Sequence, residues 1–310
     1  MDFINLIYKH NGVREPPTNA DKKIYIYIKM FLEVLSKLAS ESLLSLYPIF
    51  VKNINLPIIV QLWSRFLSFI FISSFFINYG YIFNNLLSKD GVILSFITLI
   101  HVATSYLGFH ILESGIAYSI FYFYPLLIPL IAYGTFNYFM IFQILGVFML
   151  SYESKNSNSK KEKTETKDDK EDQNIYFGIF MIILAGITEA LIYFSVRKLK
   201  TNNNWNHIFI SYFFGAILLT FLNLKDIYEL KLESNLSLSL VINVIIGLFG
   251  YLLRFFAISN LEPYIYAPLT YFGIVMAYIY GIIFNNDSLS FNKIIGTLLI
   301  IIPNFFIIHS

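Results

Sequence analysis

The stretch PYIYAPLTYFGIVMAYIYGIIFNNDSLSFNKIIGTLLIIIPNFFII, residues 263–308, consists of two long apolar runs joined by a short polar turn. The runs, Pro263–Phe284 and Leu289–Ile308, are each about 20 residues long, which is the length that an α-helix needs to cross the hydrocarbon core of a bilayer. The stretch therefore predicts two consecutive membrane-spanning helices.

The whole chain has the composition of a membrane protein. Of its 310 residues 56% are hydrophobic and only 14% are charged, with a mean hydropathy of +0.63, whereas a soluble domain carries about 25% charged residues. These values exclude a soluble globular protein. The net charge of +2 gives no basic bias toward nucleic acid as a partner. The absence of cysteine excludes disulfides, thiolate metal sites and thiol nucleophiles.

Eight further apolar runs of spanning length precede this pair. Because a chain in hydrocarbon must satisfy its own backbone hydrogen bonds, and because the runs are too long for barrel strands, they predict helices. We thus predict an all-α integral membrane protein with ten transmembrane helices: Ile24–Ile54, Leu56–Ile77, Val92–Leu112, Gly115–Tyr133, Phe136–Tyr152, Ile175–Val196, Ile208–Leu224, Leu236–Ala257, Pro263–Phe284 and Leu289–Ile308.

One charged segment divides the ten spans into five and five. It contains NSNSKKEKTETKDDKEDQ, which mixes both signs of charge without an apolar anchor and is expected to be disordered. The predicted organisation is a polar cytoplasmic N-terminal segment 1–23, which lacks the apolar region of a signal peptide, a first five-helix repeat 24–152, the linker 153–174 and a second five-helix repeat 175–310.

Short matches between the halves indicate an internal duplication. Three pairs of segments share offsets of 145 to 150 residues: Phe142–Leu150 with Asn292–Ile300, Ser105–Phe109 with Gly250–Arg254, and Ser40–Leu44 with Thr188–Ile192. Because each unit has an odd number of spans, the second copy must be inverted. Two inverted five-helix repeats are a construction typical of transporters, with the binding site between the repeats near the midplane.

The distribution of Lys and Arg in short loops predicts the orientation. Cations on the side of the amino terminus outnumber those on the other side by eight to four: Lys9, Arg14, Lys22, Lys23, Lys89, Arg197, Lys198 and Lys200 against Lys52, Lys225, Lys231 and Lys293. We therefore expect both termini in the cytoplasm. The linker would lie outside, with six lysines offset by seven acids.

The first span carries an ionisable residue at every fourth position. Lys29, Glu33, Lys37 and Glu41 therefore share one side of the helix. Glu33 precedes Lys37 in the favourable order for an intrahelical pair, so the row is either a self-neutralised stripe facing protein or the wall of a polar cavity. Lys29 is expected to reach the interface. The other three cover about 12 Å of helix, so at least one should face a cavity.

Three other spans contribute one buried charge each. Glu189 falls opposite Glu41 or Ser42 in the repeat alignment, so the two copies could place a carboxylate on each side of the pseudo-twofold axis and carry protons or bind a cation. Arg65 and Arg254 either pair with these acids to hold the bundle together or bind substrate. The candidate substrate or proton path consists of Glu33, Lys37, Glu41, Arg65, Glu189 and Arg254.

Other polar residues are expected to have structural roles. Glu113 and Glu262 lie at helix boundaries, where a carboxylate complements the N-terminal end of the following helix. His101 and His110 point to opposite faces of the third span, so they cannot share a metal ion and are expected to be hydrogen-bonded interior histidines. Several prolines should kink spans; they are Pro48, Pro125, Pro129, Pro263, Pro268 and Pro303. We expect no metal, no cofactor and no enzymatic activity, because phosphate loops, paired ligands and nucleophile elbows are absent from the sequence.

Three features carry a resemblance to a known family. They are Leu56-Pro57 ahead of Arg65, the proline-centred SIFYFYPLLIPL at Ser119–Leu130, and the closing LRFFAISNLEPYIYAPLTYFGIVMAYIYGIIFNNDSLSFNKIIGTLLI at Leu253–Ile300. With the ten spans in two halves, the sequence resembles the drug/metabolite transporter superfamily with two EamA-type repeats.

The closing turn carries the family pattern most fully. Family members typically join the last two spans by a turn with an acid, then Leu-Ser and Ile-Ile-Gly; here Asp287, Leu289-Ser290 and Ile294-Ile295-Gly296 take those places. The first repeat departs from the pattern, since its turn Gly134–Asn137 has no acid. The resemblance covers most of Ile24–Ser310 and implies a secondary transporter whose central cavity opens alternately to each side of the membrane.

The charged residues in the spans indicate which class of compound is transported. Relatives that carry sugar phosphates or nucleotide sugars usually have a cation in the ninth span, whereas Pro263–Phe284 has none. The three acids and three bases of the path balance, which favours a zwitterion such as an amino acid or an amino-acid-derived metabolite, with transport coupled to protons or exchange. The alternatives are a transporter of nucleosides, purines, nucleotide sugars or sugar phosphates on the same fold, and a non-transporting membrane receptor or assembly protein.

Overall fold

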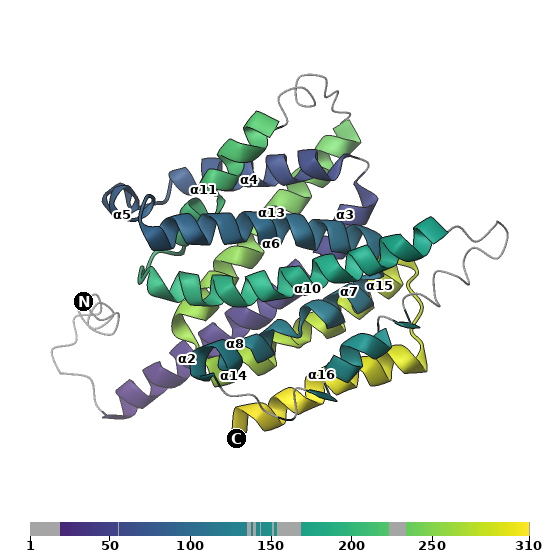
Figure 1. Ribbon diagram of the computed structural model, residues 1–310. Helices are drawn as coiled ribbons and strands as arrows, with labels where there is room; N and C mark the ends of the chain where they lie inside the picture. The colour runs from purple at the N-terminus through teal and green to yellow at the C-terminus, as the bar shows by residue number, and fades with distance from the viewer. Residues whose placement is uncertain are drawn as a thin grey trace.

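The computed structural model describes residues 19–54, 56–134, 138, 141–142, 144–150, 152–153, 169–222 and 234–309. Their regular structure is α-helical throughout, and no strand occurs among them, so the predicted all-α fold is confirmed. Figure 1 shows the helices, which are α2 (Asn19–Leu44), α3 (Tyr47–Asn53), α4 (Ile58–Ser74), α5 (Tyr79–Asn85), α6 (Lys89–Ile111), α7 (Ser114–Phe121), α8 (Tyr124–Tyr133), α10 (Asp169–Lys198), α11 (Asn204–Leu222), α13 (Ser234–Asn260), α14 (Pro263–Thr270), α15 (Phe272–Asn285) and α16 (Phe291–His309).

Six described segments are long and apolar enough to cross a membrane. They are Tyr27–Asn53, Lys89–Ile111, Asn174–Lys198, Asn204–Leu222, Leu238–Asn260 and Ile265–Asn285. Three shorter apolar helices, Ile58–Ser74, Ser114–Ile128 and Phe291–Pro303, coincide with further predicted spans. The predicted fifth span, Phe136–Tyr152, is described only in pieces, of which 144–150 is helical, so the count of ten stays a prediction.

Breaks in three spans lie within three residues of a proline. The first span breaks at Ser45–Leu46, and Pro48 then occupies the first turn of α3. The fourth breaks at Tyr122–Phe123, just before Pro125 in the first turn of α8. The ninth breaks at Tyr271, three residues after Pro268. Because proline lacks a backbone donor and clashes with the preceding turn, a new helix segment begins at or near it.

Two helical segments differ from the prediction. Helix α10 begins at Asp169, within the predicted linker and six residues before the expected boundary at Ile175. The short helix α5 was not predicted because it is too short to span. It begins at Tyr79, and the side chain of Asn78, the N-cap, accepts a hydrogen bond from the Tyr81 amide at 3.0 Å.

Helices from the two halves of the chain pack against each other in pairs. Helix α10 lies along α6, α13 along α2, α11 along α4, and α15 along α7 (Figure 1). Glycines allow the close approach. A Cβ added to Gly250 on α13 would lie 2.6 Å from Leu44 of α2, and one added to Gly178 on α10 would lie 2.9 Å from Ile111 of α6.

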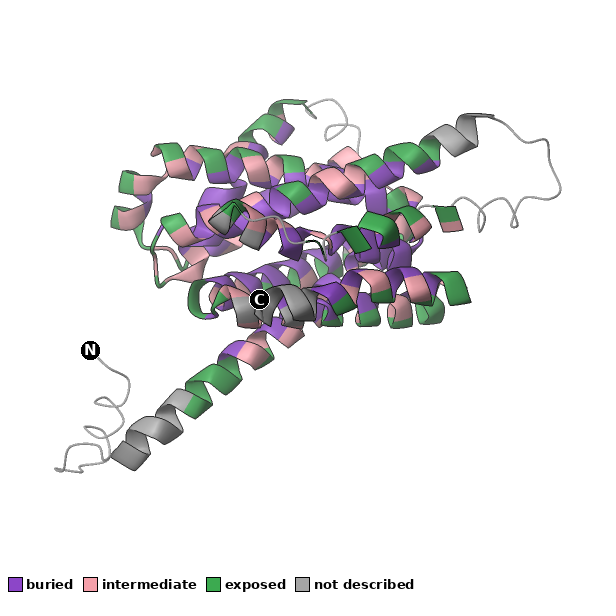
Figure 2. Cartoon of the chain, turned by 60° about the horizontal axis from the view of Figure 1, so that its bottom comes forward, coloured by how far each residue is buried: buried purple, intermediate pink, exposed green. Residues whose placement is uncertain are grey.

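The described residues have an apolar exterior and a polar interior. Figure 2 shows buried residues along the inner sides of the helices and exposed residues along the outer sides. Large apolar side chains are exposed, including Phe83 at 82%, Phe221 at 72% and Phe148 at 70%. Charged side chains, in contrast, are buried at the centre. An exterior of this kind suits contact with lipid, and the chain is a membrane protein.

Candidate functional site

Four of the six predicted charges meet at the centre of the bundle. Arg254 on α13 donates from Nη1 to Glu189 Oε1 on α10 at 2.8 Å. From Nη2 it donates to both oxygens of Glu41 on α2, at 3.1 and 3.2 Å. One guanidinium therefore joins acids from the first and second halves of the chain, and all three residues are at most 2% exposed.

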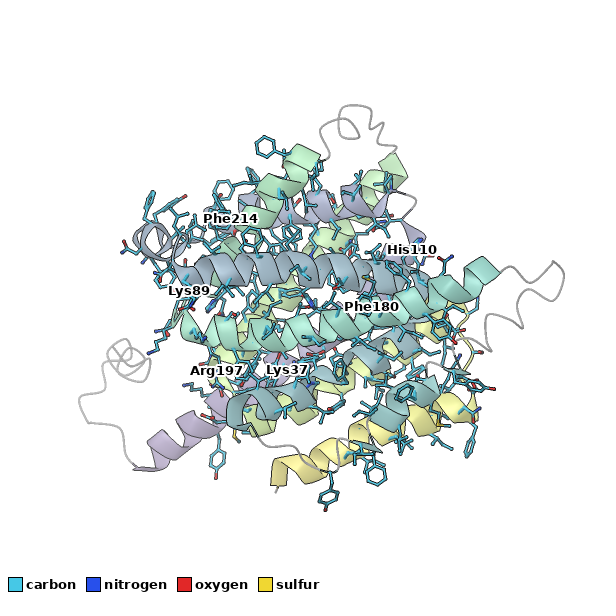
Figure 3. The ribbon with its side chains drawn as sticks, viewed as in Figure 1. Lys37, Lys89, His110, Phe180, Arg197 and Phe214 are labelled. Atoms are coloured by element: carbon cyan, nitrogen blue, oxygen red, sulfur yellow. The ribbon has the colours of Figure 1, made fainter. Side chains whose placement is uncertain are left out.

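Glu41 is the most heavily bonded member of this cluster. Lys37 forms an ion pair with Glu41 from one turn earlier on α2, and the Tyr122 hydroxyl donates to Glu41 Oε2. The Lys37 ammonium also lies 3.7 Å from the centre of the Tyr266 ring, a favourable cation–π contact. Figure 3 shows Lys37 among the side chains that fill the middle of the bundle. Glu41 thus binds two cations and a hydroxyl.

Helix packing fixes the position of Glu41. Ser40, its neighbour, donates from Oγ to the Gly250 carbonyl oxygen at 2.8 Å, and Gly250 lies one turn before Arg254 on α13. On the other side, α15 approaches through Gly273, where an added Cβ would lie 2.8 Å from Glu41 Oε2. Only glycine leaves room there for the carboxylate.

When all four groups are ionised, Lys37 and Arg254 balance Glu41 and Glu189. Balance is needed because a buried charge without a partner costs several kcal/mol, by order of magnitude. The two acids differ, however, in how fully they are bonded. Glu189 Oε2 is buried and has no hydrogen-bond donor among the described residues. Glu189 is therefore the acid with capacity for another partner.

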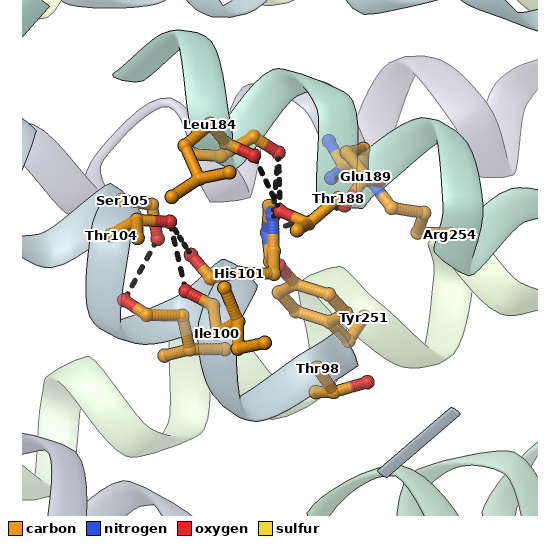
Figure 4. Close-up of polar contacts among 12 residues, drawn as sticks. Thr98, Ile100, His101, Thr104, Ser105, Leu184, Thr188, Glu189, Tyr251 and Arg254 are labelled. Carbon is orange, nitrogen blue, oxygen red and sulfur yellow. Dashed lines mark hydrogen bonds and ion pairs between the residues drawn. The ribbon is translucent and has the colours of Figure 1, made fainter. Parts of the chain in front are cut away.

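His101 on α6 also belongs to the site, although the sequence did not place it there. One ring nitrogen, Nδ1, lies 3.0 Å from the Ala185 carbonyl oxygen, and the other, Nε2, lies 3.1 Å from the Tyr251 hydroxyl and 3.3 Å from Glu189 Oε2. Figure 4 shows His101 between α6 and α10, with Tyr251 and Arg254 beside it. The expectation of a hydrogen-bonded interior histidine is confirmed for His101.

The same expectation is wrong for His110, which is exposed. It lies in the last turn of α6, where a basic side chain interacts favourably with the negative end of the helix dipole.

Glu33 lies outside the cluster, two helical turns or about 12 Å along α2 from Glu41. It pairs with Lys29 at 3.8 Å, and the Lys29 side chain is 55% exposed. The expected Glu33–Lys37 pair is therefore wrong, because Lys37 turns toward Glu41 and the Tyr266 ring in the interior. Lys29 and Lys37 therefore each pair with the glutamate four residues later along α2.

Arg65 on α4 is buried apart from the acids. Its guanidinium donates to the hydroxyls of Tyr212 at 2.8 Å and Tyr106 at 3.3 Å. Five aromatic rings, of Tyr47, Phe69, Tyr106, Tyr212 and Tyr251, lie 4.5 to 5.6 Å from its central carbon. The alternative in which Arg65 pairs with the buried acids is thus not observed among the described residues.

A small internal cavity connects Arg65 with the charge cluster. Its lining includes Tyr47, Arg65, His101, Tyr106, Tyr251 and Arg254. It has about 20 Å³ of space open to a water-sized sphere, and a water molecule needs roughly 10–15 Å³ on this scale. Polar and aromatic side chains from α2, α3, α4, α6, α7 and α13 line the cavity, together with Leu44.

A second buried ion pair joins α16 to the start of α7. Lys293 binds the Glu113 carboxylate and donates to the Ser288 carbonyl oxygen at 2.7 Å. Lys293 was counted above as a loop cation, but it is fully buried. Glu113 precedes α7 without capping it, and the Ser114 amide donates instead to Asp287 Oδ2 at 3.1 Å. The acid of the closing turn therefore acts as the cap of α7.

The described residues contain no group of three His, Cys, Asp or Glu side chains that could hold a metal ion. The arrangement is a network of buried charges without a metal centre among those residues. It brings cations and carboxylates from α2, α10 and α13 into one set of contacts.

Comparisons with known proteins agree with this architecture. The model of the EamA-like transporter family, part of the drug/metabolite transporter superfamily, matches residues 176–308, which include Glu189, Arg254 and the closing turn. This match supports the family resemblance over the second half of the chain, and the matched family suggests a membrane transporter of the drug/metabolite type. Members of the family are transporters and not enzymes.

The fold is also found among solved structures. One, described only as "Crystal structure of protein", superimposes with a TM-score of 0.57 at 11% identity, covering 88% of this chain and 94% of that chain. At this identity the likeness concerns the fold alone. No protein of curated function matches the sequence.

Proposed function

We propose that the protein is a secondary transporter that moves a small polar metabolite by alternating access between its two halves. The observation that carries the proposal is the Arg254 guanidinium, which joins Glu41 of the first half to Glu189 of the second. A purely structural ion pair would not need an acid from each half of the chain. A site shared by two halves is remade whenever they move relative to each other.

The packing supports inverted repeats. The first spans of the two halves are α2 and α10, and the third spans are α6 and α13. Exchanging the halves therefore turns the contact of α2 with α13 into that of α10 with α6, and both contacts are present. The contact of α4 with α11 maps onto itself, and that of α7 with α15 maps onto that of α14 with α8, which is also present. The aligned glycines Gly146 and Gly296 also touch, since a Cβ on Gly146 would lie 2.7 Å from the Gly296 carbonyl oxygen. Equivalent residues meet in this way on a twofold axis.

The favoured cargo is a zwitterion such as an amino acid or an amino-acid-derived metabolite. The interior offers cations and carboxylates within one connected set of side chains, so each end of a zwitterion would find an opposite charge. The contact of His101 with Glu189 supports coupling to protons, because the proton content of this pair would alter the partners left for Arg254. Both termini are placed in the cytoplasm in this proposal.

Transport by the purified protein in liposomes tests the function. Liposomes loaded with unlabelled amino acids should take up labelled amino acids faster than protein-free liposomes, with and without a pH gradient. Arg254→Gln should abolish this exchange, whereas Glu262→Gln, at an exposed glutamate, should leave it unchanged. Uptake of nucleosides or sugar phosphates alone would contradict the zwitterion but keep the transporter. No exchange of any of these compounds would contradict the proposed function.

A further inference from the structure

The two buried arginines of the interior differ in whether their charge is neutralised. Arg254 binds two carboxylates. Arg65, although only 2% exposed, has no carboxylate oxygen within 4.0 Å among the described residues, and its hydrogen-bond acceptors are the neutral hydroxyls of Tyr212 and Tyr106. Since Lys37 and Arg254 already balance Glu41 and Glu189, Arg65 has no carboxylate to balance its charge among the described residues around it.

The five aromatic rings around the Arg65 guanidinium do not neutralise that charge. Ring faces attract a cation through their quadrupole, but a ring carries no net charge. In a low-dielectric interior the field of the guanidinium is poorly screened and acts on any group that enters the adjoining cavity. Arg65 therefore makes this part of the interior selective for an anion.

Unpaired hydrogen-bond donors point to the same ligand. Arg65 Nε, Arg254 Nε and the Tyr47 hydroxyl are buried and without a hydrogen-bond partner among the described residues, and all three residues line the one small cavity. Buried polar atoms are rarely left unpaired in folded proteins. Three unpaired groups that can all donate, around one cavity and beside one uncompensated cation, are the features of an anion site.

We propose that the cavity beside Arg65 binds the carboxylate group of the transported substrate. The single uncompensated charge matches a carboxylate better than a doubly charged phosphate. The 20 Å³ of space fits the head of a carboxylate and not a whole metabolite, so the body of the substrate would occupy the space that opens as the halves separate. This inference rests on the proposed transport function, and it makes a carboxylate a requirement of the cargo.

Binding by three matched series of compounds tests the proposal. The thermal stability of the purified protein is measured in detergent with L-amino acids, with their amides, which lack the carboxylate, and with the corresponding deaminated carboxylic acids. Both series that contain a carboxylate should stabilise the protein, and the amides should not. Arg65→Gln should weaken carboxylate binding by about 100-fold, since charge-assisted hydrogen bonds are lost. Arg197→Gln is the matched control, because Arg197 also contacts a tyrosine, Tyr193, but outside the cavity.

Tyr47→Phe provides a test that does not depend on the folding of an Arg65 variant. Its hydroxyl has no partner among the described residues, so the change should leave the stability of the ligand-free protein unchanged and weaken carboxylate binding about tenfold. Tyr271→Phe, which removes another unpartnered buried hydroxyl away from the cavity lining, should change neither quantity.

Three outcomes of the stability measurements would overturn the inference. They are stabilisation by the amides alone, no stabilisation by any series, and carboxylate binding of equal strength in wild type, Arg65→Gln and Tyr47→Phe. Liposome uptake of an uncharged compound that Arg65→Gln leaves unchanged would overturn the carboxylate site while the transport function stands. Loss of all uptake in the wild-type protein would instead contradict the transport function.

Discussion

Removal of the negative charge of Glu41 should destabilise the fold, and removal of the Lys37 charge should restore part of the loss. Glu41→Gln leaves the ammonium of Lys37 without its carboxylate and leaves Arg254 with only Glu189. Both cations are buried, and breaking a buried ion pair by removing one partner costs about 3–5 kcal/mol. We expect a loss of that size in the free energy of unfolding.

Lys37→Met should cost less than Glu41→Gln. After this change Glu41 keeps the Arg254 guanidinium and the Tyr122 hydroxyl, so no charge is left without a partner. The double variant, Lys37→Met with Glu41→Gln, contains one cation and one anion, Arg254 and Glu189, which bind each other. Its loss should be smaller than the sum of the single losses by roughly 2 kcal/mol, at the upper end of the coupling energies measured between contacting residues.

A double-mutant cycle measures this coupling. Each variant is unfolded in mixed detergent micelles, and the fluorescence of Trp63 and Trp205 follows the transition. Lys29→Met with Glu33→Gln is the matched control, because that pair has the same spacing on the same helix but lies at the exposed end. Additive effects at Lys37 and Glu41, within about 0.5 kcal/mol, would refute the account of Lys37 as the counter-ion of Glu41.

Three further predictions follow from the site and the topology. Glu189→Gln keeps an oxygen for Arg254, which stays bound to Glu41, so folded yield should fall less than in Glu41→Gln while amino-acid exchange in liposomes falls; the reverse ranking would contradict a functional role. Gly273→Ala inserts a methyl group within 2.8 Å of the Glu41 carboxylate and should lower thermal stability by more than an alanine at the exposed surface does; unchanged stability would contradict the packing of α15 on the site. Single cysteines at Ser157 and Ser310 should be labelled from opposite sides of the membrane, and labelling from one side would contradict the odd number of spans in each repeat.

The sequence was sufficient to find the charges at the centre of the site. A charge inside an apolar run of spanning length is costly, so its presence already indicates a buried partner or a cavity. The repeat offset placed Glu41 opposite Glu189, and both acids reach the same arginine. Burial of the charges could be predicted because it depends on insertion energetics, which are a property of segments and not of individual rotamers, whereas the inverted repeat stays a prediction.

The partners of those charges could not be predicted from spacing alone. Lys37 could reach either Glu33 or Glu41 along the helix, and the choice depends on the Tyr266 ring, which comes from a distant segment. His101 joins Glu189 through the packing of α6 on α10, for which the sequence contains only short matches. Lys293 was assigned to a loop because it lies at the polar end of a span, although the closing turn folds over it.

The charges of the two halves are not symmetric, and this difference suggests the order in which contacts break. Each half supplies one acid, but positions 104–109, which align with Arg254 at the repeat offsets, contain no cation. Arg254 must therefore serve both acids, and any motion that separates α2 from α10 lengthens at least one of its bonds. Glu41 is also bound by Lys37 and Tyr122, whereas Glu189 has its one hydrogen bond from Arg254 and a neighbour in His101 that can take up a proton. The Glu189 bond is the less supported of the two, so we expect Arg254 to stay with Glu41 and to release Glu189 when the halves separate.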